Sequence, residues 1–191
     1  MTRYYRPILQ MFGPIPAGAY HIGWCWFDRV EVLARNAAPQ IVAARDIPAA
    51  ALDRLTAPRA PIAGLPLTAP RIMGILNVTP DSFSDGGLFT DPDAACAHAL
   101  DMVQAGADII DIGGESTRPG AQTVGHADEI ARTAPVIAAI RARSDIPISI
   151  DTRKSDVARA ALTAGASFIN DVAAMTYDPA MAQTAATSGA P

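Results

Sequence analysis

Four short apolar runs, rich in isoleucine, alternate with longer amphipathic stretches in the later part of the chain. The runs span residues 71–77, 108–113, 147–151 and 167–171. Runs this short, bounded by Gly or Pro, predict strands buried on both faces. Strands that alternate with helices pair in parallel through right-handed crossovers. The sequence therefore predicts an α/β fold with the order β-α-β-α-β-α-β-α.

The stretches between and after these runs carry helix signals at their ends. Asp91 is a typical N-cap residue, and Pro92 after it suits the first position of a helix. Pro135 lies inside the second stretch and predicts a kink or a break there. The four helices are expected from Pro92 to Gly106, over residues 127–143, over residues 155–164, and from Pro179 to about Gly189.

Residues 1–70 differ from residues 71–191 in composition and charge. The first part holds nine of the sixteen prolines and seven arginines against four acidic residues, whereas the second part has eight basic and fifteen acidic residues. Prolines crowd residues 58–70 and predict a stiff, extended connector. Apolar residues at alternate positions over residues 20–26 predict one short strand. Because no catalytic spacing occurs before residue 70, we expect an N-terminal extension followed by a domain over residues 71–191.

Composition excludes several classes of function. The net charge is −4, which argues against a nucleic-acid-binding surface, and no apolar run is long enough to cross a bilayer. Cys25 and Cys96 fall in no metal-binding spacing, so we expect ordinary thiols in a reducing cytoplasm. His21 is expected to be structural or solvated.

Polar residues end all four predicted strands: Asn77, Asp111, Asp151 and the pair Asn170-Asp171. In βα-repeat folds this edge carries the chemistry, because the loops there converge on one crevice. A single carboxylate at a strand end often only caps the next helix, and Asp151 could cap the helix that begins near Ser155. Four such strand ends favour a functional site over capping.

Two loops add hydrogen-bond donors and hydroxyl groups to this edge. Residues 79–87 are small and polar, with one aromatic side chain, Phe83. Residues 113–121 place Ser116, Thr117 and Arg118 between glycines, a combination that suits a polyanion. No nucleoside-triphosphate or dinucleotide motif is present. The residues thus indicate a phosphate-bearing substrate beside acidic and amide groups.

Two of these segments carry a specific resemblance. Residues 72–87, IMGILNVTPDSFSDGG, and residues 106–121, GADIIDIGGESTRPGA, resemble the two signature segments of the dihydropteroate synthase family. Residues 148–153 and 165–171 resemble the next two family segments in order and spacing. The family joins 6-hydroxymethyl-7,8-dihydropterin diphosphate to para-aminobenzoate and releases diphosphate, in folate biosynthesis.

The resemblance implies a role for each matching polar residue. Asn77 would hold a Mg²⁺ ion that bridges to the diphosphate. Asp151 and Asn170 would bind the pterin ring, and Asp151 would stabilise the cationic character that the pterin gains as the C–O bond breaks. Thr117 and Arg118 would contact the diphosphate and the incoming aminobenzoate.

The same resemblance implies a pocket for the aminobenzoate. Phe83, Ser116 and Pro119 would shape this pocket, which sulfonamides also occupy in the family. Arg118 would help the diphosphate to leave, because a guanidinium stabilises the charge that develops there. Loops rich in glycine would close over the bound aminobenzoate.

The family fold is a (β/α)8 TIM barrel, and residues 71–191 are expected to form its first half, about four βα units. Later family segments bring another aspartate, a lysine and an Arg-x-His motif, whereas the only lysine here is Lys154. We therefore expect the 191-residue chain alone to be inactive, and a homodimer to be possible at full length. The alternatives are a non-catalytic half-barrel or truncated product, and a methyltetrahydrofolate methyltransferase-type pterin-binding domain. The match at residues 116–120 favours the synthase.

Overall fold

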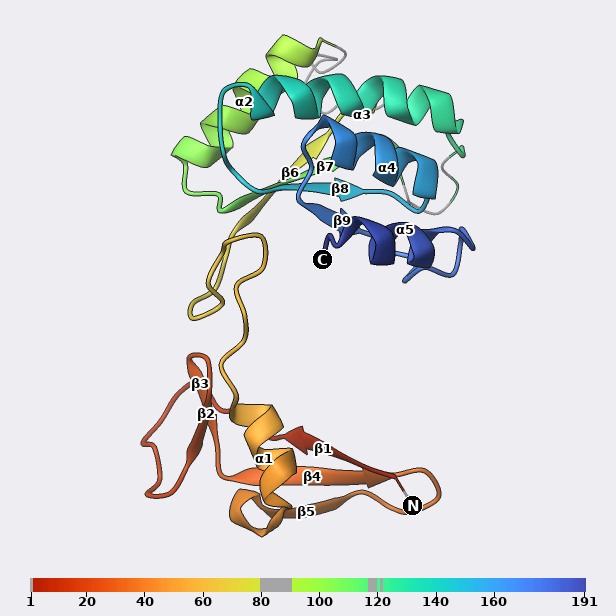
Figure 1. The fold of residues 1–191 in the computed structure, drawn as a ribbon. Coiled ribbons are helices and arrows are strands. Elements are labelled where there is room, and N and C mark those ends of the chain that lie inside the picture. Colours follow the sequence, from red (N-terminus) through yellow and green to blue (C-terminus); the bar gives the residue numbers. More distant parts are fainter. Residues whose placement is uncertain (1, 80–90, 117–119, 121) are drawn as a thin grey trace. The chain divides into compact units, whose positions relative to one another are not determined.

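The computed structural model describes residues 2–79, 91–116, 120 and 122–191. They belong to two compact units, Met1–Pro70 and Arg71–Pro191, each with an apolar core of its own (Figure 1). None of the helices in these ranges has the length and the apolar character needed to cross a membrane.

The first unit combines a three-stranded antiparallel sheet, a hairpin and one α-helix. Its elements are β1 (Arg3–Pro7), β2 (Tyr20–Ile22), β3 (Cys25–Phe27), β4 (Arg29–Ala34), β5 (Gln40–Ala43), the 3-10 turn η1 (Ala44–Asp46) and α1 (Ala49–Thr56). The sheet order is β1-β4-β5, and β2 pairs with β3. Phe27 and Val30 are fully buried and form the centre of the core with residues of η1 and α1.

The single strand predicted over residues 20–26 is wrong, because the chain reverses at Gly23-Trp24. Ile22 pairs with Cys25 in the hairpin, and Gly23 has a φ of 57°, a left-handed conformation that glycine adopts without a steric penalty. Trp24 therefore lies in the turn and is 53% exposed. A period-2 pattern of apolar residues does not reveal a two-residue turn within it.

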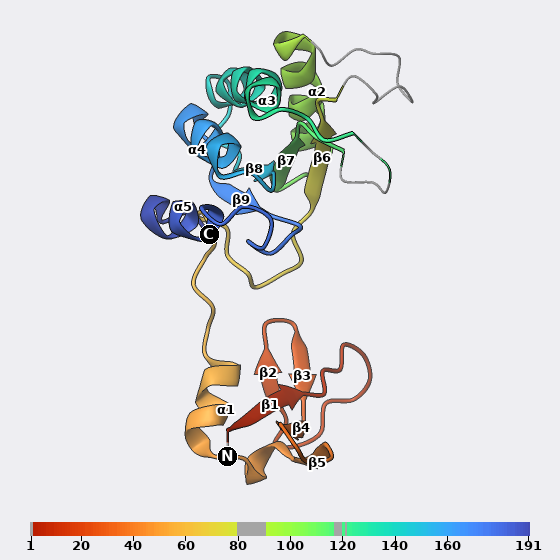
Figure 2. The same cartoon turned by 90° about the vertical axis from the view of Figure 1, so that its right-hand side faces the viewer.

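The second unit contains the predicted alternation of strands and helices. Its strands are β6 (Met73–Asn77), β7 (Ile109–Gly113), β8 (Ile148–Asp151) and β9 (Phe168–Asn170), and its helices are α2 (Pro92–Gln104), α3 (His126–Arg141), α4 (Ser155–Ala164) and α5 (Met181–Ser188). All the strands are parallel, in the order β6-β7-β8-β9. Helices α2, α3 and α4 cover one face of this sheet (Figure 1), and both views show the same layering (Figure 2). The predicted α/β class and element order are confirmed.

The helix-covered face of the sheet carries the core of the second unit. Its strand residues are fully or almost fully buried: Leu76, Ile110, Ile112, Ile148 and Ile150. They pack against small and branched residues of α2, α3 and α4. On the opposite face, Ile75 of β6 is 65% exposed. The expectation that the strands are buried on both faces is therefore wrong for β6.

Two helices differ from their predicted form. Helix α3 continues through Pro135 instead of breaking; this proline is exposed, and buried residues on either side of it, Thr133 and Val136, hold the helix against the core. Helix α5 begins at Met181, later than predicted, and the carboxylate of Asp178 is bonded to two backbone amides outside that helix. Its Oδ1 accepts a hydrogen bond from the Ala180 amide, and its Oδ2 accepts one from the Ser155 amide at 2.8 Å.

The close packing of α3 on the end of β7 generates a first prediction. A Cβ atom at Gly114 would lie 2.8 Å from Thr133 Cγ2 and 2.9 Å from Glu129 Cγ, and both neighbours are buried. We expect Gly114→Ala to reduce the free energy of unfolding by about 1–3 kcal/mol, measured by chemical denaturation. Gly74→Ala is the matched control: its Cβ would meet Met102 Sδ at 2.9 Å, and a flexible Met side chain yields more easily. Equal losses in the two variants would contradict the packing argument.

Candidate functional site

The parallel register aligns the carboxyl ends of four strands at one level. Asn77 pairs with Gly113, Gly113 with Asp151, and Asp151 with Asn170. Because side chains alternate along strands, these residues share the face of the sheet opposite the helices. Three of the residues singled out from the sequence thus form a row, which we call the strand-end row, with a glycine among them.

Gly113 brings its two neighbours in the row close together. A Cβ atom there would lie 3.3 Å from Asn77 Oδ1 and 3.7 Å from Asp151 Oδ2. The side chains of Asn77 and Asp151 therefore converge over the space that this glycine leaves. The result is a carboxamide and a carboxylate at the same rim of the sheet.

Asp111 lies one level below the row and fixes the orientation of Asn170. The Asn170 Nδ2 donates to both oxygens of the Asp111 carboxylate, at 3.3 and 3.2 Å, and Asp111 is only 6% exposed. Since the amide nitrogen is occupied, Asn170 presents its oxygen as an acceptor. Sequence reasoning noted Asp111 as a strand-end residue but gave it no role; its place two residues before Gly113 on the same face is the signal that was missed.

Asp151 is half-buried beside other acidic groups. Burial raises the pKa of Asp151 to about 6, and the negative charges of Asp111, Glu129 and Asp171 add to the rise, while Arg153 opposes it. No described residue donates a hydrogen bond to this carboxylate. A hydrogen-bond donor or a cation brought to Asp151 would therefore find a strong acceptor.

The structure does not support the capping interpretation of Asp151. The first amide of α4, that of Ser155, donates to Asp178, and the Lys154 amide before it donates to Thr152 Oγ1 at 3.2 Å. Asp171, in contrast, has a structural role, because its carboxylate oxygens accept hydrogen bonds from the amides of Ala173 and Met175. Of the acidic residues that end these strands, Asp171 is the one that stabilises a turn.

Of the remaining predicted site residues, the structure describes only Ser116. Ser116 is half-buried and lies three residues after Gly113, the last residue of β7. Phe83, Thr117, Arg118 and Pro119 lie outside the described residues. Within the described ranges, no group of three or more His, Cys, Asp or Glu side chains could hold a metal ion.

A buried ionic cluster, which sequence reasoning missed, joins the chain after β7, the chain after β8 and helix α3. Lys154 Nζ donates to the carboxylates of Glu115 and Glu129, and Arg153 Nη2 donates to Glu115 Oε1 at 2.7 Å. Burial alone would raise the pKa of Glu115, but hydrogen bonds from Lys154 and Arg153 outweigh burial and lower it. For Lys154, burial acts to lower the pKa, and the two glutamates raise it overall. Glu115 and Lys154 therefore carry opposite charges at neutral pH.

Comparison with known proteins identifies the family. A family profile described as pterin binding enzyme matches residues 73–191. The chain belongs to the pterin-binding enzyme family. Its strand-end row thus lies in the part of the chain that the family profile covers.

Relatives of this chain include dihydropteroate synthases. The enzyme of that name from Synechocystis is 56% identical over 120 residues, which cover 63% of this chain and 42% of the relative. A structure of Xanthomonas albilineans dihydropteroate synthase with 4-aminobenzoic acid gives a TM-score of 0.64 at 50% identity, over 71% of this chain and 51% of that one. The Clostridium difficile enzyme in the presence of pteroic acid gives 0.59 at 55% identity, over 63% and 46%.

These likenesses also locate the matched region within the family fold. The chain spans less than half the length of the curated relative it matches, and its parallel sheet corresponds to part of the relatives' fold. The fold is that of a partial TIM barrel, as the sequence predicts.

The electrostatics of Asp151 give a second prediction. Its folded-state pKa of about 6 exceeds the ordinary value of 3.8, so the folded chain holds this proton more tightly than the unfolded chain does. The protonated form therefore contributes stability at low pH, and that contribution falls as the pH rises from about 4 to about 6. Carboxyl NMR titration should give a midpoint near 6, and Asp111→Asn should lower it by removing a like charge. The exposed substitution Asp145→Asn is the control. A midpoint near 4 in the unmodified chain would contradict the prediction.

Proposed function

We propose that residues 71–191 supply the first half of a dihydropteroate synthase active site. The reaction would condense 6-hydroxymethyl-7,8-dihydropterin diphosphate with para-aminobenzoate to give 7,8-dihydropteroate and diphosphate. The observation that carries this proposal is the strand-end row, found in a chain that is 56% identical to a dihydropteroate synthase over the same segment. Two similar structures, one with 4-aminobenzoic acid and one determined in the presence of pteroic acid, support the choice of substrates.

The pterin would bind to Asp151 and Asn170. A pterin presents an aminopyrimidinone edge made mostly of donors, which requires acceptors from the protein. Asn170 offers its amide oxygen because Asp111 holds its nitrogen, and the Asp151 carboxylate has no hydrogen bond from a described residue. Both groups can therefore accept from the ring without losing a bond that the fold needs.

The diphosphate would lie near Asn77 and the chain that follows Glu115. Thr117 and Arg118 would contact the diphosphate and the aminobenzoate, whereas Phe83, Ser116 and Pro119 would shape the aminobenzoate pocket. The same pocket would accept sulfonamides. Support comes from the sequence of this segment and from the position of Ser116 in the chain that follows β7.

The donor set fits a magnesium ion that the substrate helps to hold. Mg²⁺ commonly takes one or two protein oxygens and completes its octahedron with phosphate oxygens and water. Asn77 Oδ1, at the exposed end of β6, is one such oxygen. When bound, Mg²⁺ would neutralise charge on the diphosphate, so Asn77 would serve mainly to place it.

The chain's own residues would act on the charges that the reaction creates. As the C–O bond to the diphosphate breaks, the pterin gains cationic character, and the half-buried Asp151 carboxylate would stabilise it. Arg118 would stabilise the negative charge on the departing diphosphate. The Asn170 amide, fixed by Asp111, would keep the ring in place as the arylamine attacks.

The other candidate functions receive less support. A methyltetrahydrofolate methyltransferase-type domain would share the pterin site, but the similar proteins described above are dihydropteroate synthases. A non-catalytic half-barrel agrees with the exposure of Ile75 on the open face of the sheet. A homodimer at full length and a cytoplasmic location stay predictions.

The open sheet leads to a third prediction, for the 191-residue chain by itself. Its four parallel strands leave Ile75 exposed at the face that bears the strand-end row, so water has access to the place where the pterin would react. We expect no dihydropteroate above background when the purified chain is incubated with both substrates and Mg²⁺. Turnover at a rate near that of the Synechocystis relative would overturn this expectation.

A chimaera tests the proposed function directly. Residues 71–191 would replace the matching segment of the Synechocystis relative, which then supplies the rest of the fold. We expect the chimaera to form dihydropteroate, and Asp151→Asn to weaken binding of the pterin diphosphate by about ten- to a hundredfold, the equivalent of one lost charge-assisted hydrogen bond.

Calorimetric titration and a melting curve check this fourth prediction together. Asp145→Asn, an exposed substitution of the same kind, is the control and should leave both unchanged. An inactive but folded chimaera would contradict the proposed function. Unchanged pterin affinity with a lower melting temperature would show that Asp151 belongs to the scaffold. Because the chimaera lacks residues 1–70, its activity would also show that these residues are dispensable for the chemistry.

A further inference from the structure

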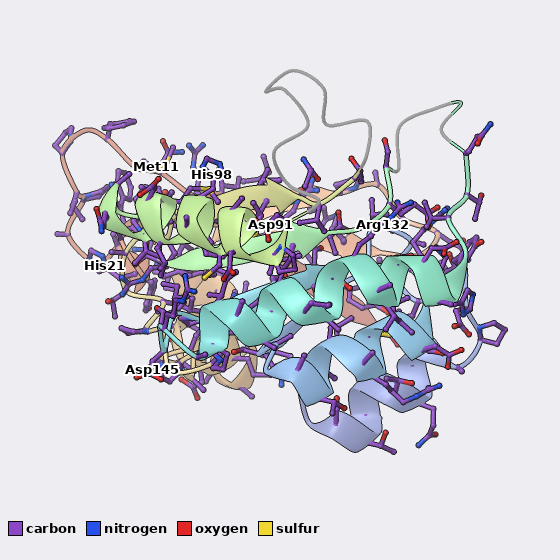
Figure 3. All side chains as sticks on the ribbon, turned by 90° about the horizontal axis from the view of Figure 1, so that it is seen from above. Met11, His21, Asp91, His98, Arg132 and Asp145 are labelled. Atoms are coloured by element: carbon purple, nitrogen blue, oxygen red, sulfur yellow. The ribbon has the colours of Figure 1, made fainter. Side chains whose placement is uncertain are left out.

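The stretch Gly114–Glu115, directly after β7, is held by charged side chains from two sides. From α3, Arg132 donates through Nη1 to the Gly114 carbonyl oxygen at 3.1 Å, and Figure 3 shows Arg132 beside the end of this strand. From the chain after β8, Arg153 and Lys154 both donate to the Glu115 carboxylate. The backbone of Gly114 is thus bound to helix α3, and the side chain of Glu115 is bound to the residues that follow β8.

Lys154 connects these two sides, because the same ammonium also donates to Glu129 on α3. The side chains of Lys154 and Glu129 are 1% exposed, and that of Glu115 is 6% exposed. Buried ions tolerate the loss of a partner poorly, since the remaining charge has neither water nor a counter-charge. Lys154 therefore cannot leave Glu129 without leaving that carboxylate uncompensated, whereas Glu115 also has Arg153 as a partner. Among the described residues, Lys154 is the cation that binds both glutamates.

The positions of these residues connect the cluster to both halves of the candidate site. Glu115 directly precedes Ser116, the first residue of the segment assigned to the diphosphate and the aminobenzoate. Lys154 follows Asp151, assigned to the pterin, by three residues. The Lys154–Glu115 contact joins residues 39 positions apart in the sequence.

We propose that Lys154 is a positioning residue of this site: its ammonium, bound to Glu115 and Glu129, fixes the start of the segment at Ser116 relative to Asp151. The functional meaning of this role rests on the proposed function, whereas the geometric role does not. Lys154 itself points into the cluster and would not touch substrate.

The cluster also affects the charge near Asp151. Its two cations, Lys154 and Arg153, balance its two glutamates. Of the groups that act on Asp151, Glu129 raises the pKa of that carboxyl together with Asp111 of β7 and Asp171 after β9, and Arg153 lowers it. Removing the Arg153 guanidinium should therefore raise the titration midpoint of Asp151 further.

NMR of the 191-residue chain tests the proposal without a ligand. In Lys154→Met, we expect the backbone order parameter of Ser116 to fall from about 0.85 to about 0.6 or lower. Lys154→Arg, which keeps the charge, should restore most of this order. An unchanged order parameter in folded Lys154→Met would overturn the proposal.

Arg141→Met is the matched control. Arg141 donates to the carbonyl oxygens of Gly165 and Ser144, so it also fastens a helix to a loop, but away from the strand-end row. We expect this variant to lose stability and to keep the order of Ser116. The same changes in Arg141→Met as in Lys154→Met would reduce the effect to general destabilisation and refute the proposal.

Glu115→Gln keeps the test decisive if Lys154→Met does not fold. This variant retains the Lys154–Glu129 pair and weakens only the link to the segment after β7. We expect the same loss of order at Ser116, and an order parameter equal to that of the unmodified chain would overturn the proposal. Because no substrate is used, a failure of the proposed function would appear in the chimaera experiment and not here.

Discussion

The parallel hydrogen bonding of β6, β7, β8 and β9 determines where every described site residue lies. In a parallel sheet, one residue of slip moves each side chain to the opposite face. A slip in β8 would turn Asp151 toward the helices and Ile150 away from them. Ile110 and Ile150 are fully buried under the helices, so burial of apolar area opposes that slip at about 25 cal/mol per Å². The isoleucines on one face therefore hold the register that aligns the polar residues on the other.

The polar face concentrates negative charge, and the consequences differ from residue to residue. Asp111 is compensated by the Asn170 amide that it orients, and Asp171 by the two backbone amides of its turn. Asp151 has no such partner among the described residues, and burial beside these charges raises its pKa to about 6. Of the three carboxylates, Asp151 would thus be stabilised most by a ligand that brings a hydrogen-bond donor or a positive charge.

Local signals in the sequence predicted most of the fold, and contacts between distant residues account for the rest. Helix α2 begins as expected because the signal is local: the Asp91 carboxylate accepts from the Asp93 amide at 3.1 Å. Gly165 ends α4 with a φ of 116°, another local requirement. The Asp178 contact with Ser155, in contrast, joins residues 23 positions apart. No pattern near Asp178 shows that partner.

The candidate site also depends partly on local signals in the sequence and partly on contacts between distant residues. Polar residues at strand ends are visible in the sequence, because the alternation of strands and helices gives each strand its direction. The orientation of Asn170 depends on Asp111, 59 positions earlier, and the buried cluster depends on the chain's single lysine meeting two glutamates from other elements. Lysine is among the residues least often buried, so position 154 alone indicates a solvated helix start. Only the packing of α3 on the strand ends turns it into an internal cation.

The way α4 is capped explains why Asp151 is available to a ligand. Helix N-termini need acceptors for their first amides, and a strand-end aspartate close to a helix start would often supply one. Here Thr152 and Asp178 accept from the amides of Lys154 and Ser155. A ligand bound to Asp151 therefore competes with no hydrogen bond that α4 needs. The fold assigns capping to Asp178 and leaves Asp151 facing the space above Gly113, next to Asn77.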